Sequence, residues 1–243
     1  MDLILLLLLL FFVAVMYSTV GHGGASGYLA VMSLLSINPD IMRSSALILN
    51  LIVSGIAFYG FRKAGYFSSK IFIPLAVTSI PSAFIGAGLP AETDLYKFIL
   101  GIILIFAALK VSGLFDKMKL NFKVEFSLIN AMITGTVLGF VSGLIGIGGG
   151  IILSPLLLFL GWCEIKQTAG VSALFIFVNS ASGLFRLSLD GLNISSEMTY
   201  MTAAVFTGGL IGSQWGSKYA NNKALRISLS LVLFIASLKL IFV

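Results

Sequence analysis

Two glycine-rich turns inside apolar sequence constrain this chain more than any other feature. The stronger turn lies within 143–155, GLIGIGGGIILSP, where five glycines allow the backbone to turn sharply and to approach other groups closely. A weaker copy, GHGGASG, occupies 21–27, so that Gly21 aligns with Gly146 about half a chain length later. Each turn is followed by a short apolar run. We therefore expect two related hairpins to organise the fold.

The apolar runs around these turns predict an all-α integral membrane protein. Hydrophobic residues make up 58% of the chain and charged residues only 10%, which is too few charges to cover a soluble domain. Runs of about twenty apolar residues are typical of transmembrane helices, whereas the strands of a β-barrel would alternate. The first run follows Asp2 without a basic segment, so we expect a retained helix rather than a cleaved signal peptide.

Ten apolar segments are expected to form helices. Most are long enough to cross a hydrocarbon core of about 30 Å, but the second and seventh, which directly follow the glycine turns, reach only about half way. The segments are 3–20, 28–37, 41–60, 70–89, 95–111, 124–145, 151–162, 166–186, 197–215 and 224–243.

The order of these segments predicts an internal repeat. A long segment, a glycine turn, a short segment and three long segments occur twice, and short motifs match in the same order, among them Ser45-Ala46-Leu47 with Ser172-Ala173-Leu174. We expect a first transmembrane repeat at 1–111, a linker at 112–123 and a second repeat at 124–243. Each repeat has five segments, an odd number, so if the short segments turn back in the middle of the membrane, the second repeat should have the opposite orientation, as in many transporters with broken helices.

The basic residues support an inverted arrangement. With the loop 61–70 in the cytoplasm, eleven lysines and arginines fall on the cytoplasmic side and four, among them Arg43, on the other side. Both termini are then outside and the linker is cytoplasmic. The net charge of +6 lies in such short loops, so it is interpreted as a topology signal and not as a nucleic-acid surface.

The half-length helices predict an anion site at the membrane midplane. The first N–H groups of a helix have no partner within it, and its N-terminus carries about half a positive charge. Two such ends pointing inward suit an anion with several oxygens. Polar residues on neighbouring segments would assist, and His22 is expected either to serve the site or to be a structural residue at a hairpin tip. The predicted substrate-binding residues are His22, Gly23, Gly24, Ala25, Ser26, Asn50, Ser54, Gly148, Gly149, Gly150, Ile151, Asn179 and Ser182.

Other chemistries are disfavoured by the residues present. All nine acidic residues lie in loops or near helix ends, and the chain has one His and one Cys, so carboxylate catalysis and metal sites are not expected. No Gly-Lys-Ser/Thr follows either glycine run, which excludes a P-loop. We expect neither a cofactor nor an enzyme activity. The lone Cys163 is expected to be inert.

The second turn resembles a known family. GFVSGLIGIGGGIILSPLL at 139–157, followed by TAGVSA at 168–173, resembles the sulfite exporter TauE/SafE family, also called the toluenesulfonate uptake permease family. The resemblance covers the chain through its two repeats. It implies a bacterial inner-membrane secondary transporter for sulfur-containing anions such as sulfite, thiosulfate, sulfonates or sulfoacetate. The first turn departs from the usual pattern with His22, with Ala25 in place of a glycine, and with Ala30 where the second copy has Pro155.

Two other function classes remain to be weighed against a carrier. A channel would present backbone carbonyls of the turns to a cation. A membrane enzyme or a non-catalytic scaffold subunit would need no anion site, although the shortage of acids, His and Cys disfavours the enzyme. Besides the anion and the lipid bilayer, the candidate partners are a coupled proton or sodium ion and a second copy of the chain in a homodimer.

Overall fold

The protein is a bundle of α-helices in a computed structural model that describes residues 3–89, 94–112 and 125–242. The helices are α1 (Leu3–Thr19), α2 (Ala25–Leu34), α3 (Pro39–Lys63), α4 (Ser69–Ala87), α5 (Asp94–Val111), α6 (Leu128–Ile145), α7 (Gly150–Phe159), α8 (Ile165–Leu189), α9 (Met198–Gln214) and α10 (Asn222–Phe242), with a short π-helical turn, η1 (Trp215–Tyr219), after α9. Each expected apolar segment corresponds to one of these helices. The prediction of an all-helical chain is confirmed for the described residues.

The sixth helix begins later than its apolar run suggests. Hydropathy predicts a start near 124, whereas α6 begins at Leu128. The reason is local capping, because the Ser127 side chain accepts a hydrogen bond from the N–H of Asn130 at 3.1 Å. Hydropathy indicates which residues are apolar enough to lie in the membrane, but the capping residue decides where the helical hydrogen bonds begin.

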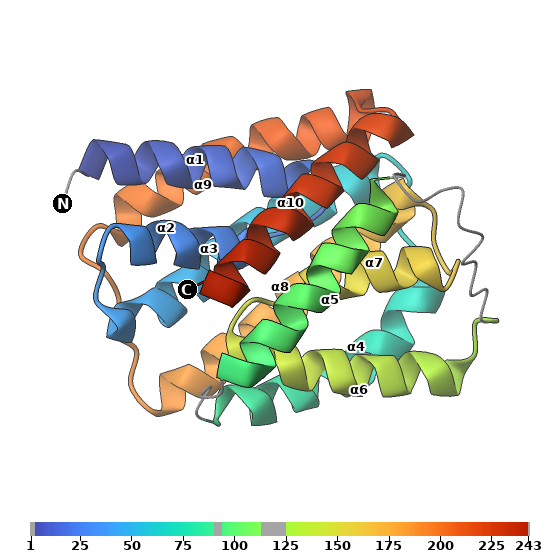
Figure 1. Cartoon of the computed structure of the whole chain (residues 1–243), viewed down its shortest axis with the longest axis horizontal. Helices are drawn as coiled ribbons and strands as arrows, with labels where there is room; N and C mark the ends of the chain where they lie inside the picture. The colour runs from blue at the N-terminus through green and yellow to red at the C-terminus, as the bar shows by residue number, and fades with distance from the viewer. Residues whose placement is uncertain (1–2, 90–93, 113–124, 243) are drawn as a thin grey trace.

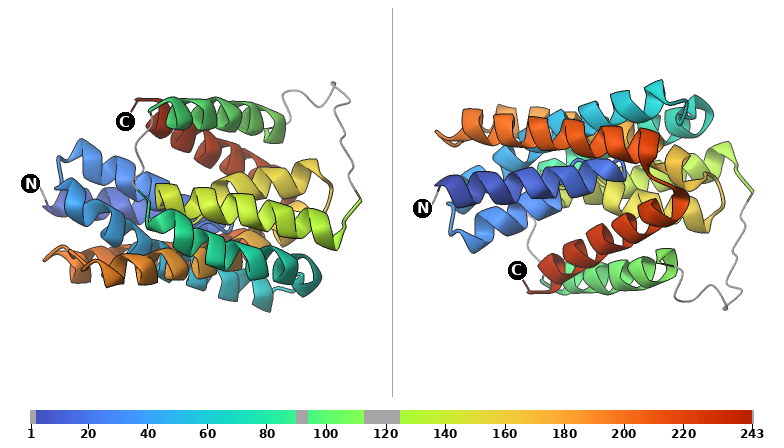
Figure 2. Two further views of the ribbon diagram at one scale, coloured as in Figure 1. Left: turned by 90° about the horizontal axis from the view of Figure 1, so that it is seen from below. Right: turned by 90° about the horizontal axis from the view of Figure 1, so that it is seen from above.

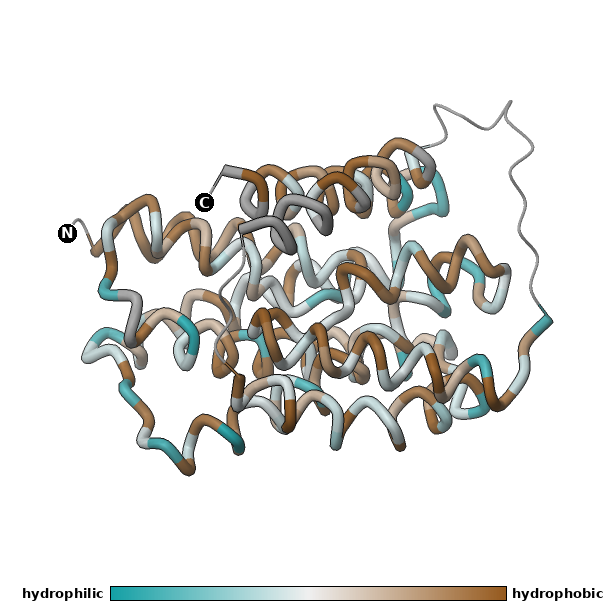
Figure 3. The backbone as a smooth tube through the Cα atoms, turned by 60° about the horizontal axis from the view of Figure 1, so that its bottom comes forward, coloured by the Kyte–Doolittle hydropathy of each residue, from teal (hydrophilic) through white to brown (hydrophobic). Residues whose placement is uncertain are grey.

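The outer surface of the bundle is apolar, as a lipid-facing surface must be. Ile4, Phe12 and Ile129 are 71%, 59% and 70% exposed, while polar side chains such as Asn50 and Ser180 are buried. Figure 3 shows that hydrophilic residues lie mostly at helix ends and in connections. Within the described residues, α4, α6, α8 and residues 41–63 of α3 are long and apolar enough to cross a membrane. The chain is therefore a multi-pass membrane protein.

Two helix pairs in the bundle are packed with their backbones in close approach. On α6, Gly135, Gly139 and Gly143 face the backbone of α4, and a Cβ at Gly139 would overlap the carbonyl oxygen of Ser79. On α9, Gly212 is packed in the same way against the backbone of Val15 in α1. Small residues spaced four apart allow this approach in a lipid environment. The sequence predicts this role for the α6 glycines.

The two halves of the chain interleave instead of forming separate bodies. α1 packs against α9, α4 against α6, α3 against α8 and α5 against α10, so each pair joins one helix from each half. α5 and α10 lie side by side along one face of the bundle (Figure 2). The short helices α2 and α7 pack on α3 and α8. The predicted linker at 112–123, apart from Ser112, lies outside the described residues.

Candidate functional site

The two glycine turns meet in the interior of the bundle. From its turn, α2 extends toward the end of the bundle where the N-terminus lies, and α7 extends toward the opposite end (Figure 1). At the turns, Gly24 has φ +101°, and Gly148 and Gly149 both have φ +74°, a left-handed conformation that favours glycine. All residues from Tyr17 to Leu29 and from Gly146 to Ile151 are buried. The N-terminal ends of two half-length helices therefore lie close together away from solvent.

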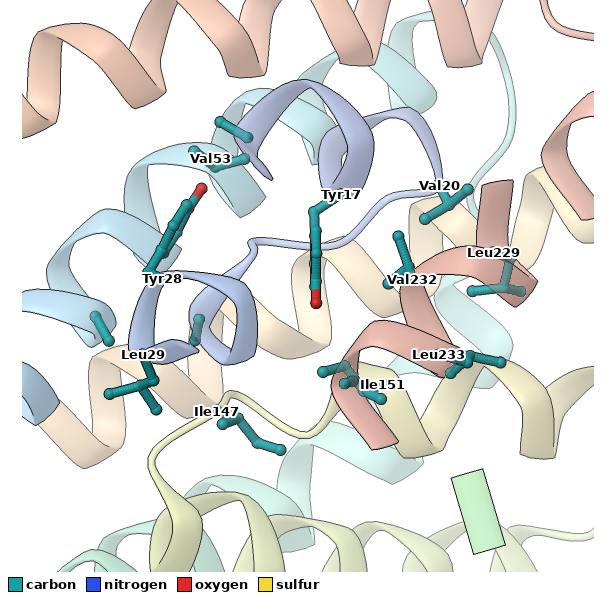
Figure 4. Packing of buried hydrophobic residues seen from close by; sticks show 14 of the residues in the cluster. Tyr17, Val20, Tyr28, Leu29, Val53, Ile147, Ile151, Leu229, Val232 and Leu233 are labelled. Atoms are coloured by element: carbon teal, nitrogen blue, oxygen red, sulfur yellow. The ribbon is translucent and has the colours of Figure 1, made fainter. Parts of the chain in front are cut away.

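Apolar side chains pack around the two turns. Ile147 and Ile151 of the second turn belong to the same buried cluster as Tyr17 and Tyr28, which flank the first turn. α10 covers this cluster with Leu229, Val232 and Leu233 (Figure 4). Polar groups at the turns are thus shielded from water, and electrostatic interactions there are stronger than at a surface.

His22 joins the first turn to the second. Its Nε2 atom lies 3.0 Å from the carbonyl oxygen of Gly150, the first residue of α7, and its Nδ1 atom lies 3.1 Å from the carbonyl oxygen of Val20. The hydroxyl of Ser154 is 3.3 Å from Nε2 and donates to Ser172 at 2.8 Å. The imidazole is 1% exposed. It is therefore held from both hairpins at once.

Asn50 in the middle of α3 connects the first turn to α8. Its Oδ1 atom accepts the N–H of Ala25 at 3.1 Å, and its Nδ2 atom donates to the Ser180 hydroxyl at 2.7 Å. A Cβ on Gly148 would lie 2.6 Å from the same Nδ2 atom. Asn50 therefore contacts both turns. Ser180, which follows Asn179 in α8, is not among the predicted substrate-binding residues.

Several backbone N–H groups at the turns have no acceptor. The first helical bonds are Tyr28 N–H to Gly24 O in α2, and Ile152 and Leu153 N–H to Gly149 O in α7. The earlier N–H groups therefore lack partners within their helices. The Oδ1 atom of Asn50 accepts a hydrogen bond from the N–H of Ala25. Among the described residues, no acceptor is found for the N–H groups of Gly23, Gly24, Ser26, Gly27, Gly148, Gly149, Gly150 and Ile151.

Arg43 adds a positive charge that the sequence reasoning missed. It was counted only as a topology signal, but its guanidinium is half-buried and lies against the second turn, where a Cβ on Gly146 would be 3.2 Å from Nε. Nη2 donates to the carbonyl oxygens of Gly143 at 2.7 Å and Ala87 at 3.3 Å. These carbonyls end α6 and α4, whose C-terminal dipoles favour a cation. The sequence did contain a signal for this position, because Arg43 is a cation inside the predicted apolar segment 41–60.

Three predicted residues make their hydrogen bonds elsewhere. Ser182 donates to the carbonyl oxygen of Ile80 in α4 at 2.7 Å. Ser54 is bonded back to Leu51 in its own helix at 3.3 Å. Asn179 donates to Phe175 at 2.8 Å, which leaves its Oδ1 atom buried without a partner. The structure thus brings His22, Gly23–Ala25, Asn50 and Gly148–Ile151 together, and Ser26 is bonded to Tyr17 at 2.9 Å beside them.

Metal-binding and thiol chemistry find no support in the described part of the chain. No group of three His, Cys, Asp or Glu side chains is close enough there to hold a metal ion. Cys163 lies between α7 and α8, and burial raises the pKa of its thiol to about 12. A buried and protonated thiol is a poor nucleophile.

Comparison with known proteins identifies the family. The family profile described as Sulfite exporter TauE/SafE matches residues 6–240. The chain belongs to this family. It is 35% identical to the probable membrane transporter protein y4hK of Sinorhizobium fredii (strain NBRC 101917 / NGR234), over 95% of each protein. It is 26% identical to the probable membrane transporter protein YjnA of Bacillus subtilis (strain 168), over 95% of this chain and 96% of that one. No solved structure matches the chain significantly.

The match to the TauE/SafE family includes both glycine turns, the first of which contains His22, and α3, which carries Asn50 and Arg43. The family and the names of these relatives indicate a membrane transporter and not an enzyme. The resemblance noted in the second turn is confirmed.

Proposed function

We propose that this TauE/SafE protein is a secondary transporter for sulfur-containing anions of the sulfite, thiosulfate, sulfonate or sulfoacetate class. The observation that carries the proposal is the set of N–H groups without acceptors at two buried helix N-termini that lie together. Each end contributes about half a positive charge, and an oxyanion offers several acceptors to both. The family description adds the sulfur chemistry.

The two turns have similar sets of donors but different surroundings. At the first turn, Asn50 already occupies the N–H of Ala25, so Gly23, Gly24, Ser26 and Gly27 remain. At the second turn, Gly148, Gly149, Gly150 and Ile151 all remain. The second turn is also next to the Arg43 guanidinium. We infer that the second turn binds most of the anion's charge and that the first turn closes over it.

The pairing of helices supports two inverted repeats. In a two-fold repeat, each of α1–α5 corresponds to the helix five places later, from α6 to α10. The contact between α1 and α9 then corresponds to the contact between α6 and α4, and the contact between α2 and α3 to that between α7 and α8; all four contacts are present. The contacts of α3 with α8 and of α5 with α10 each correspond to themselves. An inverted repeat gives a route to alternating access, because each half can adopt the other's arrangement. The proposed setting is the bacterial inner membrane with both termini outside.

A cation channel is disfavoured by the same contacts. A cation filter needs free carbonyl oxygens directed at the ion. Here the carbonyl of Gly150 faces the imidazole of His22, and Gly149 accepts two helical N–H groups. The unoccupied groups at the turns are donors. They suit an anion.

A ligand screen with the purified protein tests the proposal. Thiosulfate, sulfite and methanesulfonate are compared with sulfate and chloride in a thermal unfolding assay. At about 100 times the dissociation constant, a ligand that binds only the folded state should add about 2.7 kcal/mol. A shift in melting temperature that saturates with one sulfur anion supports the site. Equal responses to all five salts, or none to any, would contradict it.

Asn50 provides a charge test of the same site. Asn50→Asp keeps an oxygen that can accept the N–H of Ala25 but places a negative charge beside both turns. We expect it to abolish anion binding, because a like charge at this distance in a buried site costs several kcal/mol. Asn50→Ala leaves the Ala25 N–H unpaired and should destabilise the protein by about 1–3 kcal/mol while retaining measurable anion affinity. Calorimetric titration with thiosulfate measures both. Tighter binding by Asn50→Asp would exclude an anion here.

A further inference from the structure

We infer that His22 carries a proton together with the anion, so that the protein is a proton–anion symporter. This inference rests on the proposed anion site and identifies its coupling ion. It starts from an imbalance in the hydrogen bonds of the imidazole. Both ring nitrogens lie 3.0–3.1 Å from main-chain carbonyl oxygens, those of Gly150 and Val20, and a carbonyl oxygen only accepts.

A neutral imidazole cannot satisfy both carbonyls. It has one N–H donor and one bare nitrogen, so one of the two carbonyls faces a lone pair. The hydroxyl of Ser154 reaches the same Nε2 atom as Gly150 at 3.3 Å, so it offers no donor to Nδ1. Only the imidazolium ion donates to both carbonyls. The surroundings of His22 thus offer an acceptor to each ring nitrogen, and only the protonated ring uses both.

The extra proton needs a negative partner, because an isolated charge is costly in a buried site. The titratable or charged groups around His22 supply none. Tyr17 of α1 is bonded to Ser26, Tyr28 of α2 lies against Gly24, and Arg43 of α3 is itself a cation. α7 carries no titratable side chain at all. The counter-charge must come from the anion held by the neighbouring N–H groups.

Proton and anion therefore stabilise each other. Thermodynamic coupling is reciprocal, so the anion increases proton affinity by the same factor by which the proton increases anion affinity. The contact from Nε2 to Gly150 also joins the two hairpins. When the proton leaves with the anion, the ring can keep only one of its two carbonyl contacts. Loss of the contact to Gly150 would free the first hairpin from the second and allow the site to open.

Calorimetric titration of thiosulfate into the detergent-purified protein tests the inference. Thiosulfate keeps both charges between about pH 5 and 8, the range in which histidine side chains commonly titrate. Titrations in two buffers with different heats of ionisation give the number of protons taken up per anion, without any mutation. We expect uptake that approaches about one proton per anion as the pH rises, with affinity falling toward the limit of about tenfold per pH unit.

His22→Gln is the diagnostic variant, since an amide can donate to a carbonyl but does not titrate. Its proton uptake should vanish and its affinity should become independent of pH. Tyr17→Phe, which removes the nearby phenol, should keep the proton uptake of the unaltered protein. Uptake that persists in His22→Gln would overturn the inference.

The outcomes separate this inference from the proposed function. Saturable thiosulfate binding by the unaltered protein without proton uptake at any pH overturns the symport inference and leaves the anion site intact. Failure of thiosulfate, sulfite and methanesulfonate to bind at any pH overturns both. If His22→Gln does not fold, the proton count on the unaltered protein still decides.

Discussion

Replacement of Gly149 by leucine should abolish anion transport and remove the stabilisation by thiosulfate. Gly149 has φ +74°, a conformation that costs a side-chain-bearing residue about 1–2 kcal/mol. A Cβ there would lie 2.9 Å from the Cβ of Ser142 and 3.1 Å from Cε1 of Phe175. Both neighbours are in packed helices, so the turn itself must move. We expect at least a hundredfold loss of anion affinity, about 2.7 kcal/mol or more.

The chain contains a matched control for this substitution. Gly191 has φ +98°, but a Cβ there would meet nothing within 4 Å. Gly191→Leu therefore introduces similar backbone strain without crowding, and it lies outside the proposed site. It should lose some stability and keep its transport. Uptake into proteoliposomes is measured for both variants after each has given a monodisperse helical preparation in detergent. Normal uptake by Gly149→Leu would refute the assignment of the second turn as the anion site.

Gly139→Ala should destabilise the whole bundle by about 2–3 kcal/mol. A Cβ at Gly139 would overlap the carbonyl oxygen of Ser79 and lie 2.5 Å from its Cα atom. These are backbone atoms, so relief requires α4 and α6 to separate. Loss of the close contact also removes the van der Waals energy that holds helices together in lipid. For a chain of this length the melting temperature should fall by roughly 5–10 °C.

Gly183 is the corresponding control inside α8. A Cβ there would lie 3.7 Å from the nearest atom, Cδ1 of Leu47, which is an ordinary contact. Gly183→Ala should be neutral or stabilising by up to about 1 kcal/mol, because alanine favours the helix. Gly212→Ala, which faces the Val15 backbone in α1, should behave like Gly139→Ala. Equal melting temperatures for Gly139→Ala and Gly183→Ala would show that α4 and α6 are not packed backbone to backbone.

The positions of the helices and turns could be predicted from the sequence because the physical causes are local. An apolar run of sufficient length must be helical in lipid, where each backbone group needs an internal partner, and this placed helices such as α3 and α8. Glycine runs inside such segments interrupt them, which placed the half-length α2 and α7. The spacing of Gly135, Gly139 and Gly143 likewise predicted a close helix contact, although not which helix would fill it.

The partners of individual polar side chains were decided only by the tertiary structure. Asn50 and Ser182 look equally suitable as polar residues within long helices, yet Asn50 reaches both turns whereas Ser182 donates to Ile80 in α4. Arg43 appeared to be a surface charge but lies against Gly146. The contact of His22 with Gly150 joins residues in opposite halves of the chain. Such pairings depend on how helices rotate and cross when they pack, and hydropathy along one segment contains no information about the rotation of another.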